Sequence, residues 1–285
     1  HGICVARIGR IQRDWTVHCR QRGHLWRPDR QPVRPDGRRL SHNTPPQHPA
    51  IVLTTVRHKD GVSIVRVFSR EHGTVGCLVR EGVKGSRRSR NLYAPLSLLD
   101  LVGLRLIKDD LFKFDRAERM LAQDLTTGEI PRGALAMFLA EFILRTLDNG
   151  TPHCDLFDAL WRTTHRIEHE PSIGRIHLSF LVESVVVTGL MPDAPHVAPG
   201  GFGRFNLANA EWESGPPMGE DYLSVAEAEH FLRIQGMNFD EVQAETLSHD
   251  ARNLLVLQHV RYLQLHLSSP RPIRSWEVLS TVLAP

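Results

Sequence analysis

The stretch Lys84-Gly85-Ser86-Arg87-Arg88-Ser89-Arg90 combines cations with small residues that leave the backbone free to bend. Glycine lets a chain approach a ligand closely, and the planar arginine fork matches the oxygens of a phosphate group. Such a loop can wrap the backbone of a nucleic acid, although a charged run is also typical of a solvated surface loop. The first hypothesis is therefore a phosphate-binding loop.

A second candidate is the string His165-Arg166-Ile167-Glu168-His169, which has the H-x-x-E-H pattern of inverted zinc peptidases. On a helix this spacing places two imidazoles one turn apart, with a glutamate beside them. Pro171 follows closely, so the string falls on the last turn of a helix, where the helix dipole also favours histidine. No obvious third ligand follows downstream. The zinc peptidase is an alternative reading, and no metal is expected.

The segments around the basic loop indicate short strands. β-branched runs cover 51–56, 62–68 and 74–79, Gly61 and Gly73 end the turns between them, and an apolar run follows over 92–106. Short strands separated by glycine turns are typical of small barrels. We expect a five-stranded, OB-fold β-barrel over residues 50–112, with the basic loop on its surface.

The net charge of +3 hides a strong asymmetry along the chain. Residues 1–49 hold ten Arg, three Asp and no Lys, a net +7, residues 50–110 carry +5, and residues 111–285 carry −9. A basic β-rich part before an acidic remainder fits a nucleic-acid platform joined to a protein-contact domain. The predicted DNA-binding residues are Arg57, Lys59, Arg66, Arg70, Arg80, Lys84, Arg87, Arg88 and Arg90.

Residues 1–49 show neither helical nor strand periodicity, and they begin with His1 and contain six Pro. They could form a basic arm for nucleic acid. The favoured interpretation is a disordered or spurious extension in front of a true start near Pro49-Ala50, so this segment is left out of the fold.

From about Asp115 the period of the apolar residues changes from 2 to 3.6, which indicates an all-α domain over 113–285. The complete prediction is an α+β multidomain protein whose helical bundle has about six helices. Residues 192–220 are rich in Pro and Gly and predict a long loop or small irregular excursion. The predicted helices run from Pro131 to 147, from 151–155 to 169, and over 173–187, 224–234, 248–267 and 273–283.

Several functional classes lack support in the sequence. The four cysteines are scattered without a Cys-x-x-Cys pair, which favours reduced thiols in a cytoplasmic protein. No apolar run reaches membrane-spanning length, and the start has no signal-peptide pattern. There is no phosphate-binding Gly-Lys-Ser/Thr loop and no nucleophile elbow. We therefore expect no enzyme, no catalytic residue, no cofactor and no membrane association.

Residues 50–101 resemble the opening of the RecO-type recombination mediators, in which a strand, an acidic-Gly turn, a "vFTre-G" strand, a basic Gly-rich loop and an "l-pfslLel" strand follow one another. Later blocks, "ALAMFLAEFILRTL", "HLSFLVESVVVTGLMP" and the segment through Arg274-Ser275, resemble the helical domain of that family, in the same order. Only Cys154 falls in this region, so the resemblance is to the variant without a four-cysteine zinc site. The matching residues of the first block are Asp60, Phe68, Ser69, Arg70, Glu71, Gly73, Gly82, Lys84, Pro95 and Leu99.

The resemblance implies an N-terminal OB domain and a C-terminal helical domain in a bacterial, nucleoid-associated cytoplasmic protein. It also implies binding of single- and double-stranded DNA, strand annealing, contact with single-stranded DNA-binding protein, and partnership with RecR in loading RecA. Apolar side chains near two arginines of the helix from Pro131 are predicted to accept the acidic tail of single-stranded DNA-binding protein. The residues of that predicted partner site are Arg132, Phe138, Phe142 and Arg145. A generic OB-fold RNA- or DNA-binding module is the other alternative.

Overall fold

The computed structural model describes residues 47–59, 61–80, 92–120, 129–201, 203–268 and 270–284. The hypotheses about residues 1–46 and about the loop 84–90 therefore lie outside the described residues. The first strand begins at Gln47, three residues before the domain start that was expected at Ala50. Residues 47–51 of this strand pair with residues 98–102, and its residues from Ala50 to Lys59 pair with residues 62–69.

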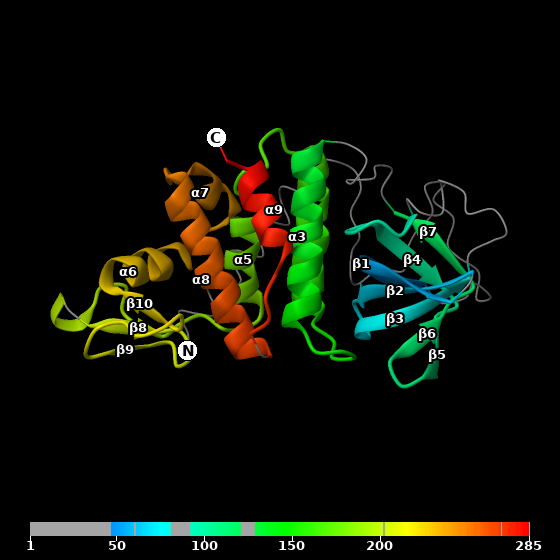
Figure 1. The fold of residues 1–285 in the computed structure, drawn as a ribbon, viewed down its shortest axis with the longest axis horizontal. Coiled ribbons are helices and arrows are strands. Elements are labelled where there is room, and N and C mark those ends of the chain that lie inside the picture. The colour runs from blue at the N-terminus through cyan, green and yellow to red at the C-terminus, as the bar shows by residue number, and fades with distance from the viewer. Residues whose placement is uncertain are drawn as a thin grey trace, which may run out of the picture. The chain divides into compact units, whose positions relative to one another are not determined.

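Seven strands form one sheet in the order β5-β6-β3-β2-β1-β4-β7 (Figure 1). All neighbouring strands are antiparallel except β3 and β6. The strands are β1 Gln47–Lys59, β2 Val62–Ser69, β3 Gly73–Arg80, β4 Leu98–Val102, β5 Arg105–Lys108, β6 Leu111–Lys113 and β7 Arg116–Arg119.

This sheet corrects two details of the predicted barrel. It has seven strands rather than five, and its end strands β5 and β7 do not pair with each other, so it is not closed. Strand β7 also lies beyond the expected end at residue 112. Strands of three or four residues are too short to show a period in the sequence, which is why β5, β6 and β7 were not separated from their surroundings.

The period-2 pattern of β1 divides its side chains between two cores. Ala50 and Val52 pack inside the sheet region with Val65, Val67 and Leu99. Ile51 and Leu53, on the opposite face, belong to the core of the helices. Successive side chains of a strand point to opposite faces, so a strand that is apolar at every position is buried on both sides. The central strand thereby joins the sheet to the helices.

Seven α-helices follow in the described residues, and α3 packs against β1, α4, α8 and α9 (Figure 1). Pro131 stands in the first turn of α3, and Ser224 and Glu227 form the capping box of α6, both as predicted. None of these helices is long and apolar enough to cross a membrane. They are α3 Ile130–Thr146, α4 Cys154–His169, α5 Ile176–Val187, α6 Val225–Ile234, α7 Phe239–Ala244, α8 His249–Leu267 and α9 Ser275–Val282.

The helical region is not purely α, which is a further correction. The stretch predicted as a loop contains a short 3₁₀ turn, η1 Pro199–Gly201, followed by the strands β8 Arg204–Asn206 and β9 Glu211–Glu213. Together with β10 Tyr222–Ser224 they form a small sheet in the order β10-β8-β9. Asn206 Nδ2 and Arg204 donate hydrogen bonds to the Glu213 carboxylate at 2.6 Å and 3.0 Å. The strands themselves are defined by backbone pairing of β8 with β9 and with β10, and these side-chain bonds reinforce the β8–β9 pair.

Gly73 shows how closely the sheet approaches the helical region. Its φ is +68°, and a Cβ atom at this position would lie 2.1 Å from the carbonyl oxygen of Thr151. The hydroxyl of the next residue, Thr74, donates a hydrogen bond to the carbonyl of Asp148 at 3.1 Å. The backbone carbonyl of Thr74 accepts a hydrogen bond from the amide of Gly150 at 3.0 Å. Only glycine fits such a contact, so the β2–β3 turn is a docking point as well as a turn.

Candidate nucleic-acid interface

The strand register gathers cations at one end of the sheet. Arg57 on β1 lies opposite Ser63 on β2, and Val62 lies between Lys59 and Arg80 of the two flanking strands. The side chains of Arg57 and Arg80 are exposed, and no ion pair is found for either of them among the described residues. Lys84, Arg87, Arg88 and Arg90 follow Arg80 within ten residues of the sequence. The side chain of Lys59 and those four residues lie outside what the structure describes.

Two other predicted DNA-binding residues point elsewhere. Arg70 donates two hydrogen bonds to the Asp158 carboxylate, at 3.0 Å and 3.1 Å, and both side chains are partly buried. This hydrogen bond, opposed by desolvation, raises the pKa of Arg70. Arg66 hydrogen-bonds the side chain of Asn149 and lies 3.8 Å from Asp110. Protein oxygens already compensate the charge of both side chains, so we propose that they help to join the sheet to its surroundings. Their contact with DNA stays a prediction.

Other cations on the sheet were missed by the sequence prediction. Lys108 on β5 and Lys113 on β6 are exposed on the hairpin at one edge of the sheet. Arg105 and Arg116 are also exposed, but each is paired with a carboxylate, at 2.7 Å to Asp115 and 2.9 Å to Glu118. The two lysines were not singled out because an isolated lysine on a three- or four-residue strand gives no distinctive pattern.

The sheet shows no activated nucleophile among its described residues. Cys77 is buried, and desolvation raises the pKa of its thiol to about 12, so the thiolate is not formed near neutral pH. Asp100 is buried too, and burial followed by repulsion from Glu118 raises its pKa. The exposed part of the sheet can therefore bind anions through its cations, and its buried groups serve the interior.

The predicted partner site on α3 has to be corrected in part. Phe138 and Phe142 are 0% and 1% exposed and pack edge-to-face against His177 and Phe180, so neither has a surface to offer a peptide. Both were chosen for their apolar character, and that character places them in the core. Arg132 donates to the carbonyls of Ile167 and Glu170 and thereby caps the end of α4.

Arg145, in the last turn of α3, is the most accessible member of that set. Its side chain is 41% exposed, and its nearest carboxylate, that of Glu141, lies 3.6 Å away. Glu141 meanwhile accepts hydrogen bonds from the backbone amide and the hydroxyl of Ser275, at 2.8 Å and 2.6 Å. Arg145 Nε has no hydrogen-bond partner among the described residues, so this exposed guanidinium can still attract an anion.

The H-x-x-E-H string lies at the end of α4, as expected, and brings donor atoms of His165, Glu168 and His169 within 4.8 Å of one another. The side chain of Glu168 is only 6% exposed, while that of His169 is 59% exposed. A peptidase needs its glutamate in contact with a water and a substrate. The burial of Glu168 argues against that alternative.

The fold and this surface define a class of protein in which an OB-type β domain with exposed cations precedes a helical domain. Comparison with known proteins gives the family. The model described as recombination protein O N terminal matches residues 46–120, and the model described as recombination protein O C terminal matches residues 128–276. The chain therefore belongs to the recombination protein O family.

Curated proteins named DNA repair protein RecO resemble this chain over most of its length. The protein of Phocaeicola vulgatus is 27% identical over 238 residues, which are 82% of this chain and 97% of the relative. That of Porphyromonas gingivalis is 29% identical over 245 residues, with 82% and 97% covered. That of Flavobacterium psychrophilum is 20% identical, with 82% and 98% covered. These relatives support a DNA repair protein.

Proposed function

We propose that this protein binds single- and double-stranded DNA, anneals complementary strands, and helps to load RecA onto DNA coated with single-stranded DNA-binding protein, together with RecR. The observation that carries the proposal is the family match across both the sheet region and the helical region. The exposed cations Arg57 and Arg80 support it, because they lie at one end of the sheet and the basic residues 84–90 follow Arg80 closely in the sequence.

Annealing requires no covalent chemistry. Two DNA strands repel each other through their phosphates, and a surface that neutralises both lowers this repulsion so that base pairing can proceed. The charge distribution supports one DNA-facing region, since residues 50–110 carry +5 and residues 111–285 carry −9. In this proposal the sheet and its basic loop contact the phosphates, and the acidic helical region contacts proteins.

The proposal is tested with the variant Arg87→Ala/Arg88→Ala/Arg90→Ala. Each phosphate contact to single-stranded DNA contributes about 0.7 to the slope of log K against log salt, so the slope should fall by roughly two units. Binding should weaken and annealing of complementary oligonucleotides should slow. Fluorescent single-stranded DNA titrated at several salt concentrations measures the slope, and fluorescence quenching on duplex formation measures annealing.

The matched control removes three arginines from the acidic region, Arg204, Arg233 and Arg261, each of which is paired with a carboxylate. It changes the net charge by the same amount and should leave the salt slope unchanged. If both triple variants kept the slope of the parent protein, the loop would have no part in DNA binding. A generic OB module would bind DNA but would not accelerate annealing of strands coated with single-stranded DNA-binding protein.

A further inference from the structure

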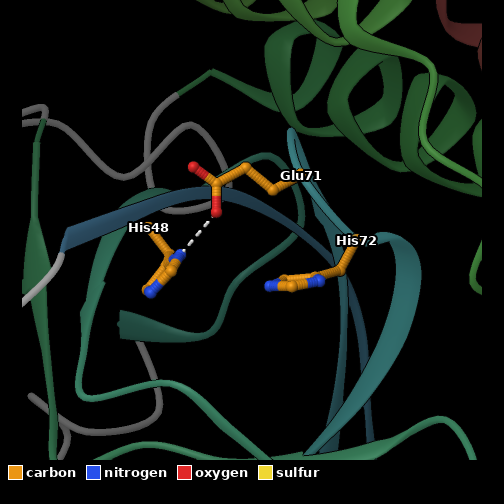
Figure 2. Close-up of side chains that lie close together, drawn as sticks. All are labelled: His48, Glu71 and His72. Carbon is orange, nitrogen blue, oxygen red and sulfur yellow. Dashed lines mark hydrogen bonds and ion pairs between the residues drawn. The ribbon is translucent and has the colours of Figure 1, made fainter.

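Strand register brings His48, Glu71 and His72 together, although Glu71 lies 23 residues after His48 (Figure 2). His48 is near the start of β1, and Glu71 and His72 form the turn between β2 and β3. Ala50 pairs with Ser69, and the amide of Arg70 donates to the carbonyl of Pro49 at 3.4 Å. The turn therefore lies directly beside the start of β1.

The three side chains present donor atoms to one another. His48 Nδ1 and Glu71 Oε2 are 2.9 Å apart, and one atom from each of the three residues lies within 4.8 Å of the other two. Figure 2 shows the ring of His72 pointing toward the ring of His48, with the carboxylate of Glu71 beside them. The His72 ring also packs on Phe112, with 5.1 Å between the ring centroids, which limits its rotation.

We propose that His48, Glu71 and His72 form a binding site for a divalent transition metal, best suited to Zn²⁺. Two imidazole nitrogens and one carboxylate oxygen are a donor set that zinc accepts, with a fourth position left for water. Zinc–ligand bonds of about 2.0–2.1 Å place tetrahedral donors about 3.3 Å apart. The donor atoms lie within 4.8 Å of one another and need a movement of about 1.5 Å at most. Because His48 and Glu71 are already 2.9 Å apart, this movement concerns mainly the approach of His72.

The surroundings of His48 agree with a bound cation. The side chain of His48 is only 14% exposed, so the surrounding residues restrict its movement. The carboxylate of Asp100, on the neighbouring strand β4, interacts electrostatically with His48, and its buried Oδ1 has no hydrogen-bond partner among the described residues. A cation bound at His48 would offset part of this buried negative charge.

Such a site would fasten the start of β1 to the β2–β3 turn, the same turn that docks on the helical region through Gly73. It does not depend on the DNA-binding function. The experiment uses the full chain, freed of metal by chelation and titrated with Zn²⁺, with bound zinc per chain determined after dialysis. Thermal unfolding with and without Zn²⁺ provides a second readout.

We expect His48→Ala and His72→Ala each to bind one zinc equivalent fewer than the parent protein and to lose the zinc-induced rise in the unfolding temperature. His58→Ala removes an exposed histidine of the same strand and should change neither readout. His169→Ala tests the other His/Glu cluster and should also leave this equivalent in place. Zinc held elsewhere in the chain contributes equally to the parent protein, His48→Ala and His72→Ala, and so cancels when these three are compared.

Glu71→Gln keeps the size of the side chain, and it replaces the alanine variants in the zinc-binding test if one of them fails to fold. It should weaken zinc binding at least tenfold while circular dichroism without zinc stays unchanged. Equal zinc content in the parent protein, His48→Ala and His72→Ala would overturn the proposal. Loss of the equivalent in His169→Ala alone would do the same, and would place the metal on α4.

Discussion

The guanidinium of Arg70 shows how a residue chosen for its charge can serve the fold instead. Its Nε and Nη2 atoms reach the two carboxylate oxygens of Asp158 on α4, in the fork geometry that arginine favours. Arg70 follows β2, so this pair links the sheet to the helices. In the sequence the two residues are 88 positions apart, and their pairing could not be inferred from spacing.

We expect Asp158→Ala to lower the free energy of unfolding by about 1–2 kcal/mol, because it removes the two hydrogen bonds of Asp158 to a partly buried cation. Arg70→Ala/Asp158→Ala should recover part of this loss. Urea unfolding of the parent, both single variants and the double variant gives the coupling energy. Strictly additive losses would mean that the pair is not coupled. A drop in DNA affinity on Arg70→Ala with no change in stability would restore its original assignment.

His177 on α5 makes stability depend on pH. The side chain is fully buried, neither ring nitrogen has a hydrogen-bond partner among the described residues, and its ring lies edge-on to Phe138. Desolvation, assisted by the charge of Arg252, lowers the pKa of His177 to about 3. The unfolded chain, with an ordinary pKa near 6.5, binds the proton more tightly, so this group destabilises the fold as pH falls below about 6.5.

At pH 5 the contribution of His177 should amount to about 2 kcal/mol of lost stability relative to pH 7. His177→Leu should remove this part of the loss, since leucine takes no proton and suits an apolar site. Urea unfolding of both proteins at pH 7 and pH 5 measures it. Burial also lowers the pKa of His259, to about 4, so His259 contributes the same additional pH dependence to both proteins. An equal pH dependence in the two proteins would contradict the assignment.

At the scale of elements, α3 illustrates why an apolar helix is a poor guide to a binding surface. Its apolar residues surround most of the helix because it packs against β1, α4, α8 and α9. The side chains left for a partner are those at its ends and Met137, which is exposed in the middle of the helix. We propose that Arg145 alone, of the four predicted residues, is placed to attract the acidic tail of single-stranded DNA-binding protein.

Arg145→Glu should weaken binding of a fluorescent acidic tail peptide about tenfold, because an attractive charge becomes repulsive. Arg132→Glu is the informative comparison. Its main expected effect is on stability, since Arg132 caps the last carbonyls of α4. Fluorescence anisotropy gives the affinity, and urea unfolding gives the stability. Unchanged affinity for Arg145→Glu would move the tail site off this helix.

For the whole molecule, charge segregation is the property that should govern DNA binding. The described cations without a carboxylate partner at the end of the sheet, Arg57 and Arg80, can contribute alongside the loop that follows Arg80. Arg57→Ala/Arg80→Ala should lower the salt slope for single-stranded DNA by about 1.4. Arg105→Ala/Arg116→Ala removes two exposed arginines that are already paired and should change the slope less. Titrations over a range of salt measure both, and equal slopes for the two variants would contradict selective use of this end of the sheet.

The sequence by itself determined the fold class and most of the elements. Period-2 runs separated by Gly61 and Gly73 predicted β1, β2 and β3, while Pro131, the Ser224 capping box and Ser248 marked helix starts within one or two residues. These signals are local, because backbone preference, capping and alternation act over a few neighbours. The family resemblance, carried by blocks in a fixed order, extended this reading to a DNA repair protein and was confirmed by the family match.

Tertiary structure alone decided how many strands the sheet has, which arginines remain exposed, and which side chains meet. The pairing of Arg70 with Asp158, the burial of Phe138 and Phe142, and the meeting of His48 with Glu71 all depend on contacts between distant segments. The physical reason is that charge and apolarity are properties of a residue, whereas exposure and pairing are properties of the space around it. That space exists only once the sheet and helices have packed together.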